Sequence, residues 1–135
     1  MQRAVCGLAV AALVFAGCGQ SETVAVTGTV TMKGQPVDKA EVLFNPKHGR
    51  FAMGVTDSAG HFTLSTAKPG DGAVPGEYTV TLGEYYPPDQ PPKPPRGGGF
   101  LPSRFATKYA DPGTSPLNVK VERGQKNDFT FDVTK

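Results

Sequence analysis

Residues 24–32 read VAVTGTVTM, and this stretch decides the fold class because apolar and polar side chains alternate along it. Val24, Val26, Gly28, Val30 and Met32 take every second position, with Ala25 and three threonines between them. This alternation is typical of a strand that buries one face and leaves the other in water. The same period of two recurs in six further short stretches. Their expected inward-facing sets are Ala40, Val42 and Phe44; Phe51, Met53 and Val55; Phe62 and Leu64; Tyr78, Val80 and Leu82; Leu117, Val119 and Val121; and Phe129, Phe131 and Val133.

Turn-forming residues separate these stretches. The clearest are Gly34-Gln35-Pro36, Asn45-Pro46, residues 57–60 (DSAG) and residues 123–126 (RGQK), since Gly, Pro, Asn and Asp each favour chain reversal. No part of the chain after residue 22 has a convincing helical period of 3.6. We therefore predict an all-β fold, a single seven-stranded antiparallel β-sandwich with transthyretin-like or immunoglobulin-like topology over residues 23–135.

Composition argues against several classes of function. The 135 residues suit one domain, and the 14 basic and 12 acidic side chains are scattered, so we expect no nucleic-acid partner. The two histidines, His48 and His61, lack the paired spacing of a metal site. No serine lies in a Gly-x-Ser-x-Gly elbow, and Gly97-Gly98-Gly99 has no Lys-Ser or Lys-Thr after it. We expect no cofactor, no metal, no catalytic residue and no enzymatic activity.

The N-terminus reads as an export signal. Arg3 precedes an apolar run over residues 4–15, which is shorter than the roughly 20 residues that a membrane-spanning helix needs. The small residues Ala16 and Gly17 then lead directly to Cys18, and this ending resembles a bacterial lipobox. The resemblance implies a cleavable signal peptide over residues 1–17 and a lipid on the Cys18 thiol. The alternative is an ordinary secretory signal in which Cys18 has no role.

Residues 18–22 are expected to form a short polar tether behind the lipidated cysteine. Gly19, not aspartate, follows Cys18. In lipoproteins of enteric type this implies transfer to the outer membrane. The expected location is therefore the cell envelope, with the protein exported and held on a membrane by its lipid anchor.

A long loop rich in proline and glycine is predicted over residues 84–103. Proline fixes φ and lacks an amide hydrogen, so this segment is expected to be extended polyproline II or disordered. Tyr85, Tyr86 and Phe100 lie in it, with Phe105 and Tyr109 close behind. These aromatics could stack on sugar rings, the proline run could dock in an aromatic groove, or the loop could be a passive spacer pinned by its aromatics. Residues 103–110 could form a short helical turn or an edge strand.

Three motifs, in order, resemble the carboxypeptidase regulatory-like domains, a transthyretin-like family. Residues 26–44 are similar to its opening "G-x-V … G-x-P-l-x-x-A-x-V-x-F", residues 56–62 (TDSAGHF) to "T-D-x-x-G-x-F", and residues 75–80 (PGEYTV) to "P-G-x-Y-x-V". With the lipobox, the resemblance implies a bacterial lipoprotein carrying such a domain. The family is defined by residues that shape the fold, so it indicates architecture rather than activity.

The expected function is that of a non-catalytic, lipid-anchored β-sandwich with a structural or protein-interaction role in the cell envelope. The alternative is a module that binds carbohydrate or cell wall through Tyr85, Tyr86 and Phe100. A cryptic metalloenzyme is the weaker alternative.

Overall fold

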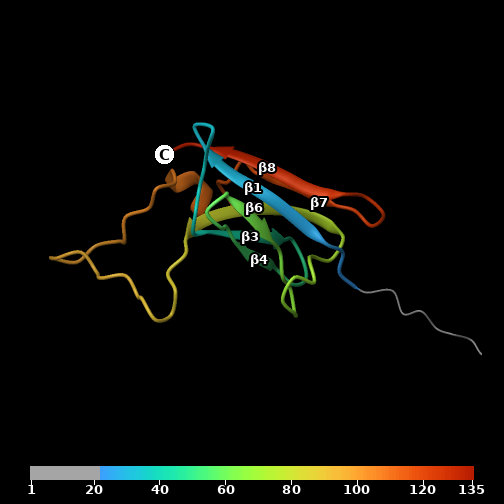
Figure 1. Ribbon diagram of the computed structural model, residues 1–135, viewed down its shortest axis with the longest axis horizontal. Helices are drawn as coiled ribbons and strands as arrows, with labels where there is room; N and C mark the ends of the chain where they lie inside the picture. The colour runs from blue at the N-terminus through green and yellow to red at the C-terminus, as the bar shows by residue number, and fades with distance from the viewer. Residues whose placement is uncertain (1–21) are drawn as a thin grey trace, which may run out of the picture.

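The computed structural model describes residues 22–135, which form a nearly all-β domain of two sheets (Figure 1). Cys18 and the expected signal peptide lie outside the described residues. Along the chain the elements are β1 (Val26–Met32), β2 (Gln35–Pro36), β3 (Ala40–Pro46), β4 (Ala52–Val55), β5 (His61–Thr63), β6 (Gly76–Glu84), the 3-10 turn η1 (Thr107–Ala110), β7 (Asn118–Val121) and β8 (Asn127–Val133).

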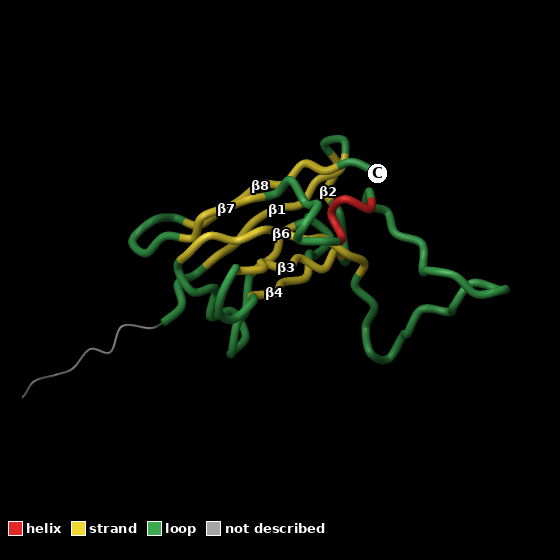
Figure 2. Tube along the Cα trace, turned by 180° about the vertical axis from the view of Figure 1, so that it is seen from behind, coloured by secondary structure: helices red, strands yellow, loops and turns green. Residues whose placement is uncertain are grey.

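Each sheet has four strands. In one sheet β1 is central, with β2 and β5 along one edge and β8 along the other, while the second sheet has the order β4-β3-β6-β7. The tube in Figure 2 shows the two sheets stacked as layers. One strand more than the predicted seven is present, because Gln35 and Pro36 continue past the turn and pair with Met32 and Thr31.

The prediction of an entirely antiparallel sandwich is wrong for one pair of strands. β1 and β8 run parallel over their whole length, from Val26 opposite Asn127 to Met32 opposite Val133. β7 ends, and the turn after it crosses to the other sheet, at the end of the sandwich where β1 begins. β8 therefore starts beside the start of β1 and must run in the same direction.

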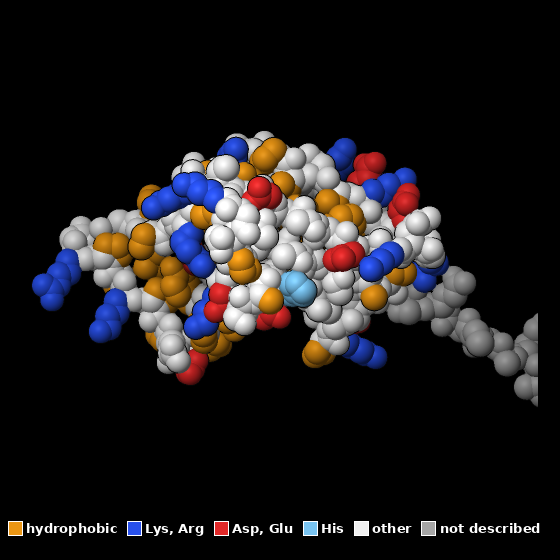
Figure 3. Space-filling view, turned by 45° about the horizontal axis from the view of Figure 1, so that its top comes forward, with side chains coloured by type: hydrophobic (Ala, Val, Ile, Leu, Met, Phe, Trp, Pro, Cys, Tyr) orange, Lys and Arg blue, Asp and Glu red, His pale blue; other side chains and the backbone are white. Residues whose placement is uncertain are grey.

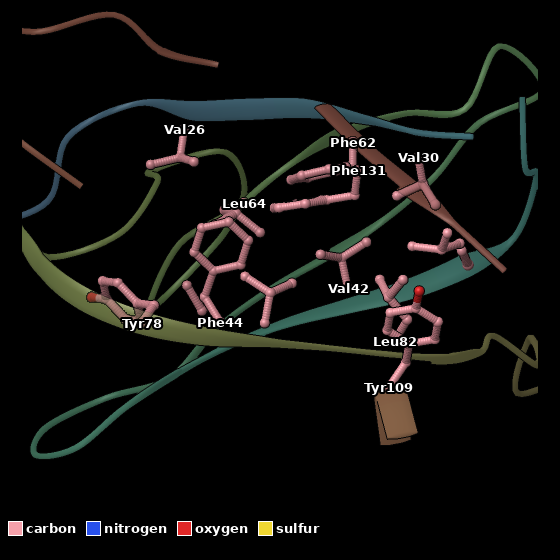
Figure 4. Packing of buried hydrophobic residues seen from close by; sticks show 14 of the residues in the cluster. Val26, Val30, Val42, Phe44, Phe62, Leu64, Tyr78, Leu82, Tyr109 and Phe131 are labelled. Carbon is pink, nitrogen blue, oxygen red and sulfur yellow. The ribbon is translucent and has the colours of Figure 1, made fainter. Parts of the chain in front are cut away.

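The core lies between the sheets and is centred on Phe44 (Figure 4). Its ring is 5.7 Å from the ring centroid of Tyr78 and 6.3 Å from those of Phe62 and Phe131. Such tilted and edge-on contacts suit the quadrupoles of aromatic rings. The predicted inward sets of most strands are confirmed by burial, including Val26, Val30, Val42, Leu64, Val80, Val121 and Val133.

The predicted facing of β4 is wrong. Phe51 and Met53 were expected inside, yet their side chains are 59% and 40% exposed, and Ala52 and Gly54 face the core instead. The space there is narrow: a Cβ atom built on Gly54 would lie 2.8 Å from the Thr63 carbonyl oxygen and 3.3 Å from Leu64 Cδ2. Only small residues fit, so the large apolar side chains of this strand turn outward.

The turn between β4 and β5 shows what the "T-D-x-x-G-x-F" residues do physically. The buried Thr56 hydroxyl donates to the Val37 carbonyl at 2.6 Å and accepts from the Ala40 amide at 2.8 Å. Asp57 Oδ1 accepts the amides of Ala59 and His61. Gly60 has φ +76°, which disfavours other residues. The motif thus ties this turn to the connection between β2 and β3.

The two ends of the sandwich carry different features. Residue 22 enters at one end, whereas the proline-rich loop after β6 projects as an arm from the opposite end in both views (Figures 1 and 2). The C-terminus lies at the same end as the loop. Figure 3 shows Lys and Arg side chains beside apolar side chains at this loop end of the molecule.

Candidate interaction site at the proline-rich loop

The neck of the loop is closed by Glu84 and Arg104. Arg104 Nε donates to both carboxylate oxygens of Glu84 at 3.0 Å each, and Nη2 donates to Oε2 at 2.7 Å. The backbone amide of Arg104 donates to Oε1 at 2.6 Å. This bidentate pair joins the last residue of β6 to the point where the loop returns, so the ends of a long excursion are held together.

The neck is also tied to the body of the sandwich. Arg104 Nη2 donates to the Asp38 carbonyl at 2.8 Å, and the Tyr85 amide donates to the Lys39 carbonyl at 3.0 Å. Both carbonyls belong to the connection between β2 and β3. The loop base therefore has a defined position relative to both sheets.

Electrostatics favours the charged forms at the neck. Partial burial would raise the pKa of the Glu84 carboxyl, but the hydrogen bonds and positive charge of Arg104 outweigh this effect and leave that pKa lowered. The hydrogen bond with Glu84 in turn raises the pKa of Arg104, against a smaller opposing effect of burial. The pair is ionised at neutral pH.

Phe105 and Tyr109 anchor the returning chain. Both side chains are buried in the core cluster, and Figure 4 shows Tyr109 reaching from η1 toward Leu82. The open prediction for residues 103–110 is thus resolved as a short helical turn at Thr107–Ala110. Two of the five aromatics near the loop serve to attach it to the sandwich.

The three predicted ligand contacts do not form one surface. Tyr85 is half-buried and Tyr86 is 37% exposed, and both line a shallow depression of about 350 Å³ at the neck, with Asp38, Gln90 and Arg104 among its other lining residues. Phe100 is fully exposed on the loop and does not line this depression. Tyr85 and Tyr86 are therefore brought together, and Phe100 is not placed with them.

Sequence reasoning missed Arg104, which organises the neck. A signal was available: Glu84 and Arg104 are opposite charges at the two ends of the proline-rich segment. Their meeting depends on the loop returning to its starting point, which alternation along strands does not predict.

The described part of the chain contains no cluster of side chains that could bind a metal ion. Among residues 22–135 no three His, Cys, Asp or Glu side chains lie close enough together to hold an ion. His48 and His61 are both exposed. Within the same residues, no helix is sufficiently long and apolar to span a membrane.

The comparisons leave the fold and the loop geometry to be interpreted by themselves. Neither a protein-family model, nor a curated protein, nor a solved structure matches this chain.

Proposed function

We propose that this protein is a non-catalytic, lipid-anchored module of a bacterial cell envelope, which holds its sandwich at a membrane and presents the proline-rich loop to a partner. The observation that carries this proposal is the placement of residue 22 and the loop at opposite ends of the sandwich (Figures 1 and 2). An anchor on the N-terminal side would leave the loop end facing away from the membrane.

The proposed anchor is a lipid on Cys18. Cys18 is four residues before Glu22, and four extended residues reach at most about 14 Å. Two or more acyl chains give stable membrane attachment, whereas one gives only marginal binding. A tether this short would keep the sandwich close to the bilayer, at the outer membrane if the resemblance to enteric lipoproteins extends to sorting.

The transthyretin-like assignment belongs to the same proposal. Two four-stranded sheets and a tight turn at each of the first two family motifs support it: Lys33 and Gly34 both have positive φ before Gln35-Pro36, and residues 57–60 form the second turn. Such a domain is a scaffold, so the proposal places function in the loop rather than in the sandwich.

Metabolic labelling with palmitate tests the anchor. In the native host the wild-type protein should incorporate label and sediment with membranes, and Cys18→Ser should lose both properties because no other cysteine follows in the chain. Cys6→Ser is the matched control and should keep both. Label that persists in Cys18→Ser would contradict the anchor.

A second candidate function is binding of carbohydrate or cell wall at the neck. The half-exposed Tyr85 and Tyr86 beside polar groups of Asp38 and Gln90 favour it, because sugar rings stack on aromatic faces while their hydroxyls bond to polar side chains. Tyr85→Ala/Tyr86→Ala should then reduce retention on murein or polysaccharide columns. Phe100→Ala is the control, and retention that is unchanged in the double variant would reject this candidate.

A further inference from the structure

In the segment PPKPPR, residues 91–96, the burial pattern fits polyproline II over residues 91–95, and Arg96 lies in the turn that follows. Pro92 and Pro95 are half-buried, whereas Pro91, Lys93, Pro94 and Arg96 are exposed. This burial repeats every three residues, a period that polyproline II shares with the 3-10 helix, and residues 91–96 belong to no helix. Pro91 and Pro94 therefore lie on one outward-facing ridge, about 9 Å apart at 3.1 Å per residue.

The segment is free to bind because it takes part in no sheet. Residues 87–103 belong to no strand or helix. Two turns close within the loop, through the Gln90 amide to the Pro87 carbonyl and the Gly98 amide to the Pro95 carbonyl. The first turn ends at Gln90, and the second begins at Pro95 and includes Arg96, so the exposed Pro91 and Pro94 lie between the two turns.

The charge of the segment is positive. Lys93 and Arg96 are exposed, and neither forms an ion pair within residues 22–135. Asp89 is the only acidic residue between Tyr85 and Ser103. A partner that receives this segment would gain most from carboxylates near the two cations.

We propose that residues 91–96 are a polyproline II ligand for a protein partner whose groove is lined by aromatic side chains and rimmed by carboxylates. The inference rests on the proposed function and adds the chemistry of the partner. Pro91 and Pro94 would occupy the aromatic groove, and Arg96 would meet the acidic rim two residues further on. Because the helix is already formed, docking would lose little conformational entropy.

The neck fixes the position of both ends of the loop relative to the sandwich. The bidentate contact of Arg104 with Glu84, and the buried Phe105 and Tyr109, hold both ends of the loop on the sandwich. The proline ridge and the two cations therefore project from the end of the molecule opposite residue 22 (Figures 1 and 2). An envelope partner could reach them without displacing any part of the sheets.

Titration against a surrogate receptor tests the inference. The purified full-length protein, in detergent micelles, is added to an SH3 domain with an acidic rim, and the fluorescence of the tryptophan in its groove is recorded. Saturable binding is expected. Pro91→Ala/Pro94→Ala should raise the Kd by about tenfold or more, because the contacts of the two prolines with the aromatic groove are lost. Arg96→Glu should raise the Kd by a similar factor, because the contact of the arginine with the acidic rim is lost.

The matched control removes two prolines from the other face. Pro92→Ala/Pro95→Ala shortens the proline run equally but leaves the outward ridge, so its binding should fall less than threefold. Absence of saturable binding, or equal losses in the two double variants, would overturn the inference. Palmitate labelling is measured separately: a labelled protein that does not bind overturns only the partner chemistry, and an unlabelled protein that binds overturns only the anchor.

Discussion

Single residues in this protein act mainly by satisfying backbone groups at turns. Thr56 is the clearest case, because its hydroxyl is buried and bonds to backbone on both sides of the connection between β2 and β3. A buried amide or carbonyl that loses its partner destabilises the fold by more than the hydrogen bond itself contributes. The threonine of the turn motif is thus a structural residue.

Thr56→Val should destabilise the domain by about 1–3 kcal/mol, since valine keeps the shape but leaves the Ala40 amide and Val37 carbonyl unpaired. Thermal denaturation followed by circular dichroism should show Tm lowered by several degrees. Thr56→Ser keeps the hydroxyl and should stay much closer to wild type. Equal Tm values for the valine variant and wild type would show that the two groups find other partners.

The ion pair of Glu84 with Arg104 makes stability depend on acid pH. The lowered pKa of Glu84 means that its contribution is complete above the ordinary carboxyl pKa of 4.5 and is lost as pH falls below that value through the lowered pKa. Glu84→Gln should therefore have a lower Tm than wild type at pH 7. The two Tm values should converge as the pH falls below 4.5 and the Glu84 carboxylate becomes protonated, and a difference that stays constant in acid would contradict the pair's role.

At the scale of elements, the room left by neighbouring strands decides which face of a strand is buried. Large residues stand at position 51, just before β4, and at position 53 within it, whereas the small residues at 52 and 54 are inside. β4 is joined to the chain just after β5 by backbone bonds between Met53 and Ser65, which bring the two sheets close at this edge. Close approach excludes the larger side chains.

Two substitutions in adjacent positions test the facing of β4. Ala52→Leu should destabilise by about 1–3 kcal/mol, because the extra carbons have no space in the core. Met53→Ser should change stability by less than about 0.5 kcal/mol, since its side chain is on the outer face. Urea denaturation of both variants distinguishes the cases, and the opposite ranking would restore the facing that alternation predicts.

At the scale of the molecule, the sandwich and the loop are separable in stability. In one of the two sheets the first strand pairs along its whole length with the last, β1 with β8. The loop contributes Phe105 and Tyr109 to the core only after it has returned through the neck. The projecting part should therefore be dispensable for folding, whereas β8 should not.

Replacing residues 88–101 with Gly-Gly should shift Tm by no more than a few degrees, because shortening the loop alters its closure free energy by only about 1 kcal/mol. Deleting residues 127–135 should abolish the cooperative transition, since β1 would lose its long partner. Calorimetry of both variants provides the measurement. Unfolding of the loop-deleted chain would show that the arm is part of the domain.

The all-β class and most of the core could be predicted from the sequence. Val30, Val80, Val121 and Phe131 each stand between two polar residues and are buried, and a period of two is typical of strands. The proline-rich loop was equally predictable, since its residues cannot join a sheet interior. The neck was not, because the contact of Glu84 with Arg104 spans twenty residues of irregular chain.

The amino-acid sequence alone therefore determined that strands form, where they break and that residues 84–103 stay outside the sheets, because these are local consequences of side-chain period and backbone chemistry. Only the tertiary structure decided that β8 runs parallel to β1, that Ala52 rather than Phe51 faces the core, and that the arm leaves the end opposite residue 22. Each of these depends on how segments distant in the sequence connect, pair and pack, which no local pattern encodes.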